Sequence, residues 1–389
     1  MNSFPPSERM KAVKMPPIAD IMRRVSELKS SGKRIYSMAQ ATPWYSPPSG
    51  VLDDFAQKIK EPFLHGYSPD PGFPWARKAV AEDFRIRRQI DLDPGNEIQL
   101  TCGASQAFLS ALLTVSSPGD SVAVIEPYYF DHVFAVKFSG LGLRSIPMAE
   151  YNGRWLMPLE DLKRVLPEVS ALVIVNPGNP TGTVIPDSVL MQIAGMTADT
   201  GTFLIIDETY ERFVFTEDSW HPWQDEHGRH VLTLGSFSKS LGMPGWRLGY
   251  LFGSADLLEQ TIKVQDSVVI CPPSPSQYLL ERALGEREWI SEMSNGIKTR
   301  LELCRAALKN NTSLSWRESG GGFFTLAAYK GNMPSMDAAL YLLDEYGIGT
   351  IPGSAFGESG EGHLRISFGC LSDEELEPAM KLLSEVSFP

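Results

Sequence analysis

From about residue 95 onward, short apolar runs alternate with longer segments that carry one apolar face. The apolar runs show no in-out alternation, and they lie at 121–127, 171–177, 202–208 and 231–234. Continuous apolar runs of this kind are typical of strands that are covered on both faces of a sheet. The segments between them have helical periodicity, and they lie at 106–115, 129–141, 159–166 and 189–201. This order predicts an α/β fold in which a three-layer large domain contains a mostly parallel central sheet.

The pattern changes after about residue 265. Helical periodicity covers about 277–309, and three short apolar runs and a last amphipathic helix follow it, at 323–329, 347–351, 363–369 and 373–386. The change predicts a second, smaller α+β domain. We therefore expect an N-terminal arm and helix that belong to the small domain or a dimer contact, then a large domain, then a small C-terminal domain, with bounds 1–45, 46–275 and 276–389.

The N-terminal part lacks the alternation. Its proline-rich first 16 residues predict an extended arm, residues 18–32 predict an amphipathic helix with a glycine stop, and residues 41–50 predict a proline-rich loop. The first residues do not contain the apolar core of a signal peptide. No apolar run approaches the roughly 20 residues that span a bilayer.

Composition and charge narrow the class of protein. The chain has 389 residues, of which 43% are hydrophobic, and a formal net charge of -12. A negative net charge argues against a nucleic-acid-binding protein and against a polybasic membrane-surface protein. The four cysteines form no CxxC pair, so we do not expect a disulfide scaffold. These features predict a soluble, cytoplasmic protein that binds neither nucleic acid nor membranes.

Small and polar residues follow each predicted strand, at 103–105, 127–129, 176–182, 207–210 and 236–239. In doubly wound sheets, ligands bind outside the carboxyl ends of the strands. We therefore expect these five segments to line one rim of the sheet.

The residue types at this rim suit a phosphorylated aromatic cation. Ser105 stands at a helix start, whose free N–H groups favour a phosphate, although a plain helix cap is the commoner interpretation. Ser236 and Arg247 can bind the same phosphate. Asp207 ends an apolar strand and needs a cation beside it, unless it forms a helix cap or a structural ion pair. Lys239 leaves a buried strand among hydroxyl groups and glycines, where a solvated surface turn is the alternative. Pyridoxal 5′-phosphate would satisfy all these groups.

Seven motifs point to one family. In chain order they are HGYSPDPG, GASQA, EPYY, NPGNPTG, DETY, SFSKSLGMPGWRLG and LRISFG. With them the chain resembles the class I and II aminotransferases, which are pyridoxal-phosphate enzymes of fold type I, and in particular the bacterial aspartate-aminotransferase-like members. The resemblance covers nearly the whole chain. It implies transfer of an amino group from an L-amino acid to a 2-oxo acid, through an aldimine at Lys239 and the pyridoxamine form of the cofactor.

The resemblance also implies roles for the residues that hold and tune the cofactor ring. Lys239 would form the aldimine and then carry protons between the substrate Cα and the cofactor C4′. Asp207 would pair with the protonated pyridine nitrogen. Asn179 and Tyr210 would donate hydrogen bonds to the phenolic oxygen, and Tyr129 would stack on the ring.

Further residues would bind the phosphate and the substrate. The phosphate would be held by Ser236, Ser238, Arg247, Ser105 and the amide of Ala104. Tyr67 would reach the phosphate of a neighbouring subunit, which implies a homodimer with shared active sites. Arg365 would bind the substrate α-carboxylate with help from Asn179.

The stretch MAQATPWYSPP departs from the family pattern. Many members have a glycine that contacts the substrate carboxylate where this chain has Ala41 or Thr42. Trp44 and Tyr45 would line the side-chain pocket, or else pack under the N-terminal arm. No position matches the second arginine that binds a dicarboxylic substrate. Aspartate, aromatic and basic or specialised amino acids therefore all stay open as substrates.

Other functions remain to be weighed. Relatives with almost the same cofactor site eliminate, cyclise or oxidise amino acids, so a non-transaminating pyridoxal-phosphate enzyme of a biosynthetic pathway is the alternative. A cofactor-sensing transcription factor would need a basic DNA-binding segment of roughly 60–80 residues before the fold, which this acidic chain lacks. The stretch HPWQDEHGRH at 221–230 has no metal-ligand spacing. We expect a solvated surface loop there and no metal site.

Overall fold

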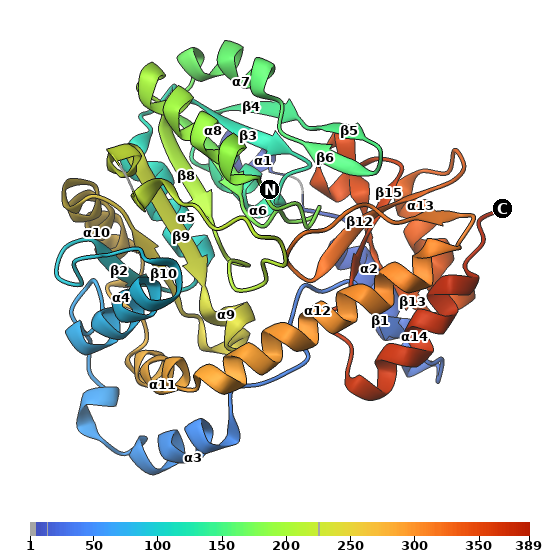
Figure 1. Cartoon of the computed structure of the whole chain (residues 1–389), viewed down its shortest axis with the longest axis horizontal. Helices are drawn as coiled ribbons and strands as arrows, with labels where there is room; N and C mark the ends of the chain where they lie inside the picture. Colours follow the sequence, from blue (N-terminus) through green and yellow to red (C-terminus); the bar gives the residue numbers. More distant parts are fainter. Residues whose placement is uncertain (1–4, 14, 225) are drawn as a thin grey trace.

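The computed structural model describes residues 5–13, 15–224 and 226–389. Its centre is a seven-stranded sheet in which only one strand, β10, runs antiparallel to its neighbours (Figure 1). In spatial order the strands are β2 (Ile98–Thr101), β10 (Gly249–Phe252), β9 (Val231–Ser236), β8 (Phe203–Asp207), β7 (Ala171–Val175), β3 (Ser121–Glu126) and β4 (Gly142–Pro147). The predicted α/β fold with a mostly parallel sheet is confirmed.

Helices cover both faces of this sheet. On one face, side chains of β3 such as Val122 and Val124 pack against α5 (Ala104–Val115), α6 (Phe130–Phe138) and α10 (Ala255–Val269). On the other face, Ala123 packs with α7 (Leu159–Val165) and α8 (Asp187–Thr200). Successive strand residues point to opposite faces, so a strand that is buried on both faces must be apolar at every position. This explains the continuous apolar runs of the sequence.

Three helices extend this part of the molecule. They are α3 (Ser49–Lys58), α4 (Pro74–Arg88) and α11 (Ser274–Gly285), and α11 packs against both of the others.

A second sheet with its own core lies in the C-terminal part. It is four-stranded and antiparallel, in the order β11 (Leu314–Ser315), β12 (Phe324–Tyr329), β15 (His363–Ser367) and β14 (Ile351–Pro352). Its helices are α12 (Arg287–Lys309), α13 (Ser335–Tyr341) and α14 (Asp373–Glu385). The N-terminal α2 (Ile18–Ser30) shares this core, and β1 (Tyr36–Ser37) pairs in parallel with β13 (Ile348–Gly349).

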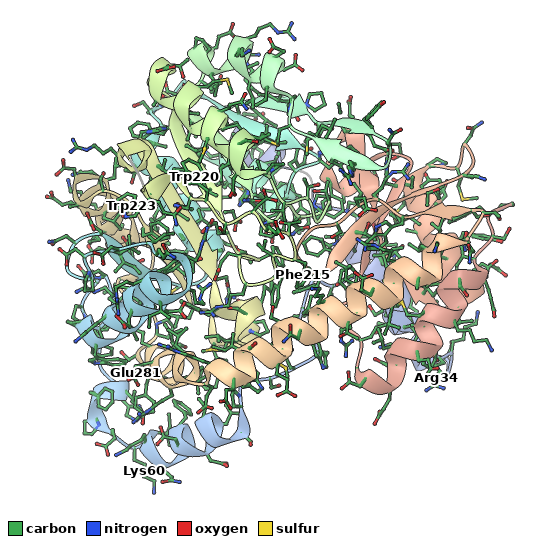
Figure 2. The ribbon with its side chains drawn as sticks, viewed as in Figure 1. Arg34, Lys60, Phe215, Trp220, Trp223 and Glu281 are labelled. Atoms are coloured by element: carbon green, nitrogen blue, oxygen red, sulfur yellow. The ribbon has the colours of Figure 1, made fainter. Side chains whose placement is uncertain are left out.

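The helix α12 (Arg287–Lys309) and the segment after β8 both join the central sheet to the C-terminal part. Figure 1 shows α12 as one long helix that runs from beside α9 (Phe237–Ser240) to α14, and it contacts both. The second connection is the segment after β8, where the Phe215 amide donates to the Gly320 carbonyl (2.8 Å) and Val214 bridges Gly321. Phe215 lies near the middle of Figure 2, between the two sheets.

The structure corrects three local predictions. The predicted extended arm contains a helical turn, α1 (Glu8–Lys11), while residues 1–4 and 14 lie outside the described residues. The single strand predicted at 347–351 is two strands, β13 and β14, which join different sheets.

The stretch 221–230 is the third correction, because it is not a solvated loop throughout. His221 is fully buried, with its Nδ1 accepting from the Trp223 amide (3.0 Å) and its Nε2 3.2 Å from the Thr233 hydroxyl. Residue 225 lies outside the described residues. None of the helices in the described parts of the chain is long and apolar enough to span a bilayer.

Candidate active site

The five strand-end segments meet at one cavity of about 900 Å³. The predicted site residues among its lining are Ala41, Ala104, Ser105, Tyr129, Asn179, Asp207, Tyr210, Ser236, Ser238, Lys239, Arg247 and Arg365. Arg247 reaches this rim because it precedes β10, the reversed strand, whose first residue lies where the other strands end. Three predicted residues do not line the cavity, and they are Tyr67, Trp44 and Tyr45. Tyr67 is 80% exposed on the surface, and Trp44 packs against α12.

One end of the cavity, which we call the open pole, consists of Ala104, Ser105, Ser236, Ser238 and Arg247. Ser105 and Arg247 are exposed. Gly103 precedes α5 with φ of +83°, and no side chain caps the first amides of that helix. A Cβ on Gly103 would lie 2.7 Å from an Arg247 guanidinium nitrogen. A side chain at position 103 would therefore displace the guanidinium from this helix start.

Hydroxyl groups and backbone carbonyls complete the open pole. The Ser236 hydroxyl donates to the Ser238 hydroxyl (2.8 Å) and accepts from the Ser238 amide (3.1 Å). Arg247 donates to the Pro244 carbonyl (3.0 Å), and no carboxylate forms an ion pair with it in the described part of the chain. Free helix amides, hydroxyl groups and a cation together favour an anion.

The opposite end, the buried pole, is built around Arg365 of β15. Its side chain is buried, and it donates to the Asn179 amide oxygen (3.1 Å) and to the Ala39 carbonyl (2.6 Å). Its Nε has no hydrogen-bond partner among the described residues. Burial lowers the pKa of the guanidinium, which still remains charged. A buried cation without a carboxylate partner is a binding site for an anionic ligand.

Lys239 lies between the two poles. It belongs to α9, which begins where β9 ends, and its Nζ donates to the Ala41 carbonyl (2.5 Å). Burial, followed by the nearby Arg365 and Arg247, lowers the pKa of Lys239 to about 8, while Asp207 acts in the opposite direction. A substantial fraction of this amine is therefore neutral near physiological pH, as a nucleophile or a proton acceptor requires.

Asp207 is a buried carboxylate at the end of β8. One oxygen accepts from the Thr209 amide (2.9 Å), and the other lies 3.1 Å from Nε2 of His132. His132 comes from the first turns of α6, and its ring packs at a tilt against Phe108, with ring centroids 4.1 Å apart. Sequence reasoning did not identify His132. The available signal was its position three residues after Tyr129, on the helix whose start was placed at the rim.

The two tyrosines of the site are buried or half-buried hydrogen-bond donors. Tyr129 donates to the Asp131 carboxylate (2.6 Å), and burial, followed by that carboxylate, raises the pKa of Tyr129. Tyr210 is buried against Phe323 and Phe324, and burial raises its pKa as well. Both hydroxyl groups therefore keep their protons at working pH.

An apolar wall completes the lining, and it includes Ile18, Phe130, Phe134 and Phe138. The basic residues among the lining residues are Lys239, Arg247, Arg365 and His132. In the described residues no group of three or more histidine, cysteine, aspartate or glutamate side chains is placed to hold a metal ion.

The chain is similar to known proteins over nearly its whole length. The family model "aminotransferase class I and II" matches residues 43–383. An aromatic aminotransferase, ISS1, from Arabidopsis thaliana is 32% identical, with 96% of this chain and 94% of the relative covered. An aspartate aminotransferase from Pyrococcus abyssi is 30% identical, with 94% and 95% covered. Among solved structures, N-succinyldiaminopimelate aminotransferase from Mycobacterium tuberculosis superposes with a TM-score of 0.90 at 25% identity, covering 98% of this chain and 100% of that one.

Proposed function

Since the chain belongs to the family of class I and II aminotransferases and is an aminotransferase, we propose that it uses pyridoxal 5′-phosphate, bound covalently through Lys239. The position of Lys239 carries this proposal. A half-buried amine with a lowered pKa lies between an open anion-binding pole and a buried cation, in one cavity with a buried carboxylate.

The open pole fits a phosphate group. The first amides of α5, the hydroxyl groups of Ser105, Ser236 and Ser238, and the guanidinium of Arg247 would hold it. Gly103 supports this assignment, because a Cβ there would displace the Arg247 guanidinium from its present position. A doubly charged phosphate suits a helix start with an adjacent cation.

The middle of the cavity fits a protonated aromatic ring. Asp207 would accept a hydrogen bond from the ring nitrogen, and its contact with His132 fixes the carboxylate in place. Tyr129 would lie against one face of the ring. Asn179 would donate to the ring oxygen through its amide N–H, and Tyr210 through its hydroxyl, which burial keeps protonated by raising its pKa.

When bound, the cofactor supplies an electron sink for the bond that is broken at the substrate Cα. The chain supplies binding, orientation and proton transfer. Lys239 would take the proton from Cα and return it to the adjacent cofactor carbon. Arg365 would bind the substrate α-carboxylate through its two-nitrogen fork, which fixes the Cα–H bond relative to the Lys239 amine.

We propose an amino acid with an aromatic or other apolar side chain as donor, and a 2-oxo acid as acceptor. After Arg247 and Arg365 are assigned to the phosphate and the α-carboxylate, the lining residues of this chain offer no third arginine for a second carboxylate. The wall of Ile18 and the α6 phenylalanines suits an apolar group instead. The relative that is named an aromatic aminotransferase supports this choice.

We also propose that two copies of the chain form the active unit. Two exposed apolar side chains lie beside the cavity, Val268 of α10, which is among its lining residues, and Ile270 just beyond α10. The backbone of Gly66, next to the exposed Tyr67, accepts from the Ser274 hydroxyl close to this patch. A second copy that covers it would place Tyr67 at the neighbouring phosphate. Ile270→Asp should yield a monomer in light scattering with weakened cofactor binding, and an unchanged dimer would contradict this arrangement.

Borohydride reduction followed by peptide mass spectrometry tests the cofactor assignment. The protein is loaded with pyridoxal 5′-phosphate, reduced and digested, and we expect the phosphopyridoxyl mass on Lys239. Lys239→Ala should show no label and no turnover. Lys263→Ala changes an exposed lysine of α10, and it should behave as the wild type. A label on another lysine would overturn the proposal.

A panel of amino acids then tests the substrate class. Without an oxo acid, an apolar aromatic donor should bleach the visible band of the loaded enzyme and release one equivalent of its 2-oxo acid. Aspartate should do so at least about 10-fold more slowly, because its second carboxylate lacks a cation in this chain. Faster reaction with aspartate would contradict the apolar assignment. Continued release of ammonia would contradict the transfer reaction itself.

A further inference from the structure

Lys239 is held at both ends by one short segment that comes from outside the central sheet. This segment, residues 39–45, lies between β1 and α3. Its Ala41 carbonyl accepts from Lys239 Nζ, and its Tyr45 hydroxyl donates to the Lys239 backbone carbonyl (2.7 Å). The carbonyl of Ala39 accepts from Arg365. One loop therefore contacts both the reactive amine and the cation of the buried pole.

The Tyr45 side chain is fixed by close packing. Its ring lies edge-on to Trp44 and to Trp289 of α12, with centroids 4.8 and 5.4 Å away. Gly242 follows α9 with φ of +62°, and a Cβ there would lie 2.7 Å from the Tyr45 carbonyl oxygen. Burial raises the pKa of the Tyr45 hydroxyl, so it remains a donor over the whole working range.

Trp44 ties the same segment to the C-terminal part. Its ring stacks on the guanidinium of Arg300 on α12, with the cation 3.8 Å from the ring centroid. Gly296, one turn earlier on α12, makes room for the ring, because a Cβ there would lie 2.8 Å from it. Arg300 is almost fully buried and donates to the Leu371 carbonyl (2.7 Å) and to Asp373 at the start of α14.

These contacts form one continuous path. It runs from the backbone of Lys239 through Tyr45 and Trp44 to Arg300, and from there to the first turn of α14. In Figure 1, α12 passes from α9 to α14 as one helix, and it contacts both. Every link in this path is a hydrogen bond or a contact with an aromatic ring.

We propose that Tyr45 is a positioning residue for Lys239, and that Trp44 and Arg300 couple its position to the placement of the C-terminal sheet. The proposal rests on the reactive role assigned to Lys239 above. A small displacement of a reacting amine has a large effect on rate. A shift of the C-terminal part relative to the central sheet would therefore alter turnover through this segment without any change in the ligand contacts.

Tyr45→Phe tests the positioning role, because it removes only the hydroxyl. We expect kcat to fall roughly 5- to 10-fold, with KM and cofactor affinity within about twofold of the wild type. Tyr329→Phe is the matched control, because the Tyr329 hydroxyl also donates to a backbone carbonyl (Met333, 2.5 Å), but in the C-terminal part. Both variants should lose a similar amount of Tm. An unchanged kcat in Tyr45→Phe, or an equal loss in Tyr329→Phe, would overturn the proposal.

Hydrogen–deuterium exchange on the full-length loaded enzyme tests the coupling. Peptides that cover residues 235–243 should take up deuterium faster in Tyr45→Phe and also in Arg300→Met, but not in Tyr329→Phe. Asp373→Ala removes only the exposed end of the path, so it keeps the test possible if Arg300→Met does not fold, and it should give a smaller increase in the same peptides. Unchanged deuterium uptake at 235–243 in both Arg300→Met and Asp373→Ala would refute the link to α14.

The two levels of proposal fail in different ways. If borohydride reduction places no label on wild-type Lys239, the cofactor assignment is wrong whatever the exchange data show. If Lys239 is labelled but Tyr45→Phe behaves as its control, only the positioning role is wrong.

Discussion

The two arginines of the cavity illustrate two ways of building an anion site. Arg247 is exposed, lies in a tight turn before β10 and contacts the backbone around it. Arg365 is buried within the C-terminal sheet and reaches across to Asn179 and Ala39, which come from two distant parts of the chain. The first site is made by neighbouring turns, and the second by long-range packing.

The difference has an energetic consequence. An exposed cation stays solvated without its ligand, and the amides and hydroxyl groups around it share the binding of an anion. A buried cation loses solvation, and in Arg365 the partial charges of an amide oxygen, a backbone carbonyl and the rings of Phe324 and Phe356 offset that loss without a full negative charge. A ligand carboxylate at the buried pole should therefore interact more strongly per contact than an anion at the open pole, since little water screens it.

Arg365→Met should give the largest effect, because it removes the cation of the buried pole. Removing one partner of a buried charge pair typically costs about 2–5 kcal/mol, so we expect kcat/KM for the amino acid to fall roughly 30- to 5,000-fold. Cofactor affinity should change less than about twofold, and Tm should stay equal or rise, because an uncompensated buried charge is removed. Steady-state kinetics, cofactor titration and calorimetry measure the three quantities.

Arg247→Met is the matched control for this contrast. It should weaken cofactor binding and leave the amino-acid KM of the saturated enzyme nearly unchanged. If both variants changed the same parameter, the division into an open and a buried pole would be wrong.

Lys239→Met should reveal how much the half-buried amine of Lys239 changes the free energy of unfolding of the cofactor-free protein. The pKa of Lys239 is about 8 when folded, below its ordinary value of 10.5. Between these values the unfolded chain binds more protons than the folded one, so wild-type stability gains from this group as pH rises. Lys239→Met lacks this gain.

The lowered pKa of Lys239 also sets the size of this effect on stability. The stability advantage of Lys239→Met at pH 7 should shrink by about 2 to 3 kcal/mol towards pH 10.5. Calorimetric Tm values of both proteins between pH 7 and 10.5 measure it, because the other titrating groups are common to the two. A constant difference in Tm would show that folding does not lower the pKa of Lys239.

The open pole was the part of the site that sequence predicted most directly. Ser236, Lys239 and Arg247 lie within twelve residues, and Ser105 follows a strand that ends at the same rim. Local turn chemistry and the strand-end rule suffice for such a site. The mostly parallel sheet followed from the apolar pattern for the same reason, since burial on both faces leaves a local signature.

The parts that sequence did not predict depend on contacts between distant residues. The contact of His132 with Asp207 joins positions 75 residues apart, and Trp44 meets Arg300 over a still longer separation. His221 was expected in a solvated loop, because the polar residues next to it in the sequence gave no sign that its ring is buried. The domain bounds, the cytoplasmic location, the homodimer and the individual cofactor contacts remain predictions.

Gly103→Ala gives the smallest of these effects and tests the open pole alone. Its φ of +83° and the 2.7 Å approach of a new Cβ to Arg247 act together. Gly140→Ala is the matched control, because Gly140 has φ of +77° and nothing within 4 Å of a new Cβ. Both variants should lose about 1 kcal/mol of stability from the left-handed backbone.

Only Gly103→Ala should also weaken cofactor binding, by roughly 10-fold, because it displaces the Arg247 guanidinium from the helix start. Cofactor titration by absorbance, alongside thermal unfolding of both variants, separates the two contributions. Equal cofactor affinity in the two variants would mean that the guanidinium binds its anion without the helix start. The open pole would then be a solvated cation rather than a site built by its turns, and its contrast with Arg365 would rest on burial alone.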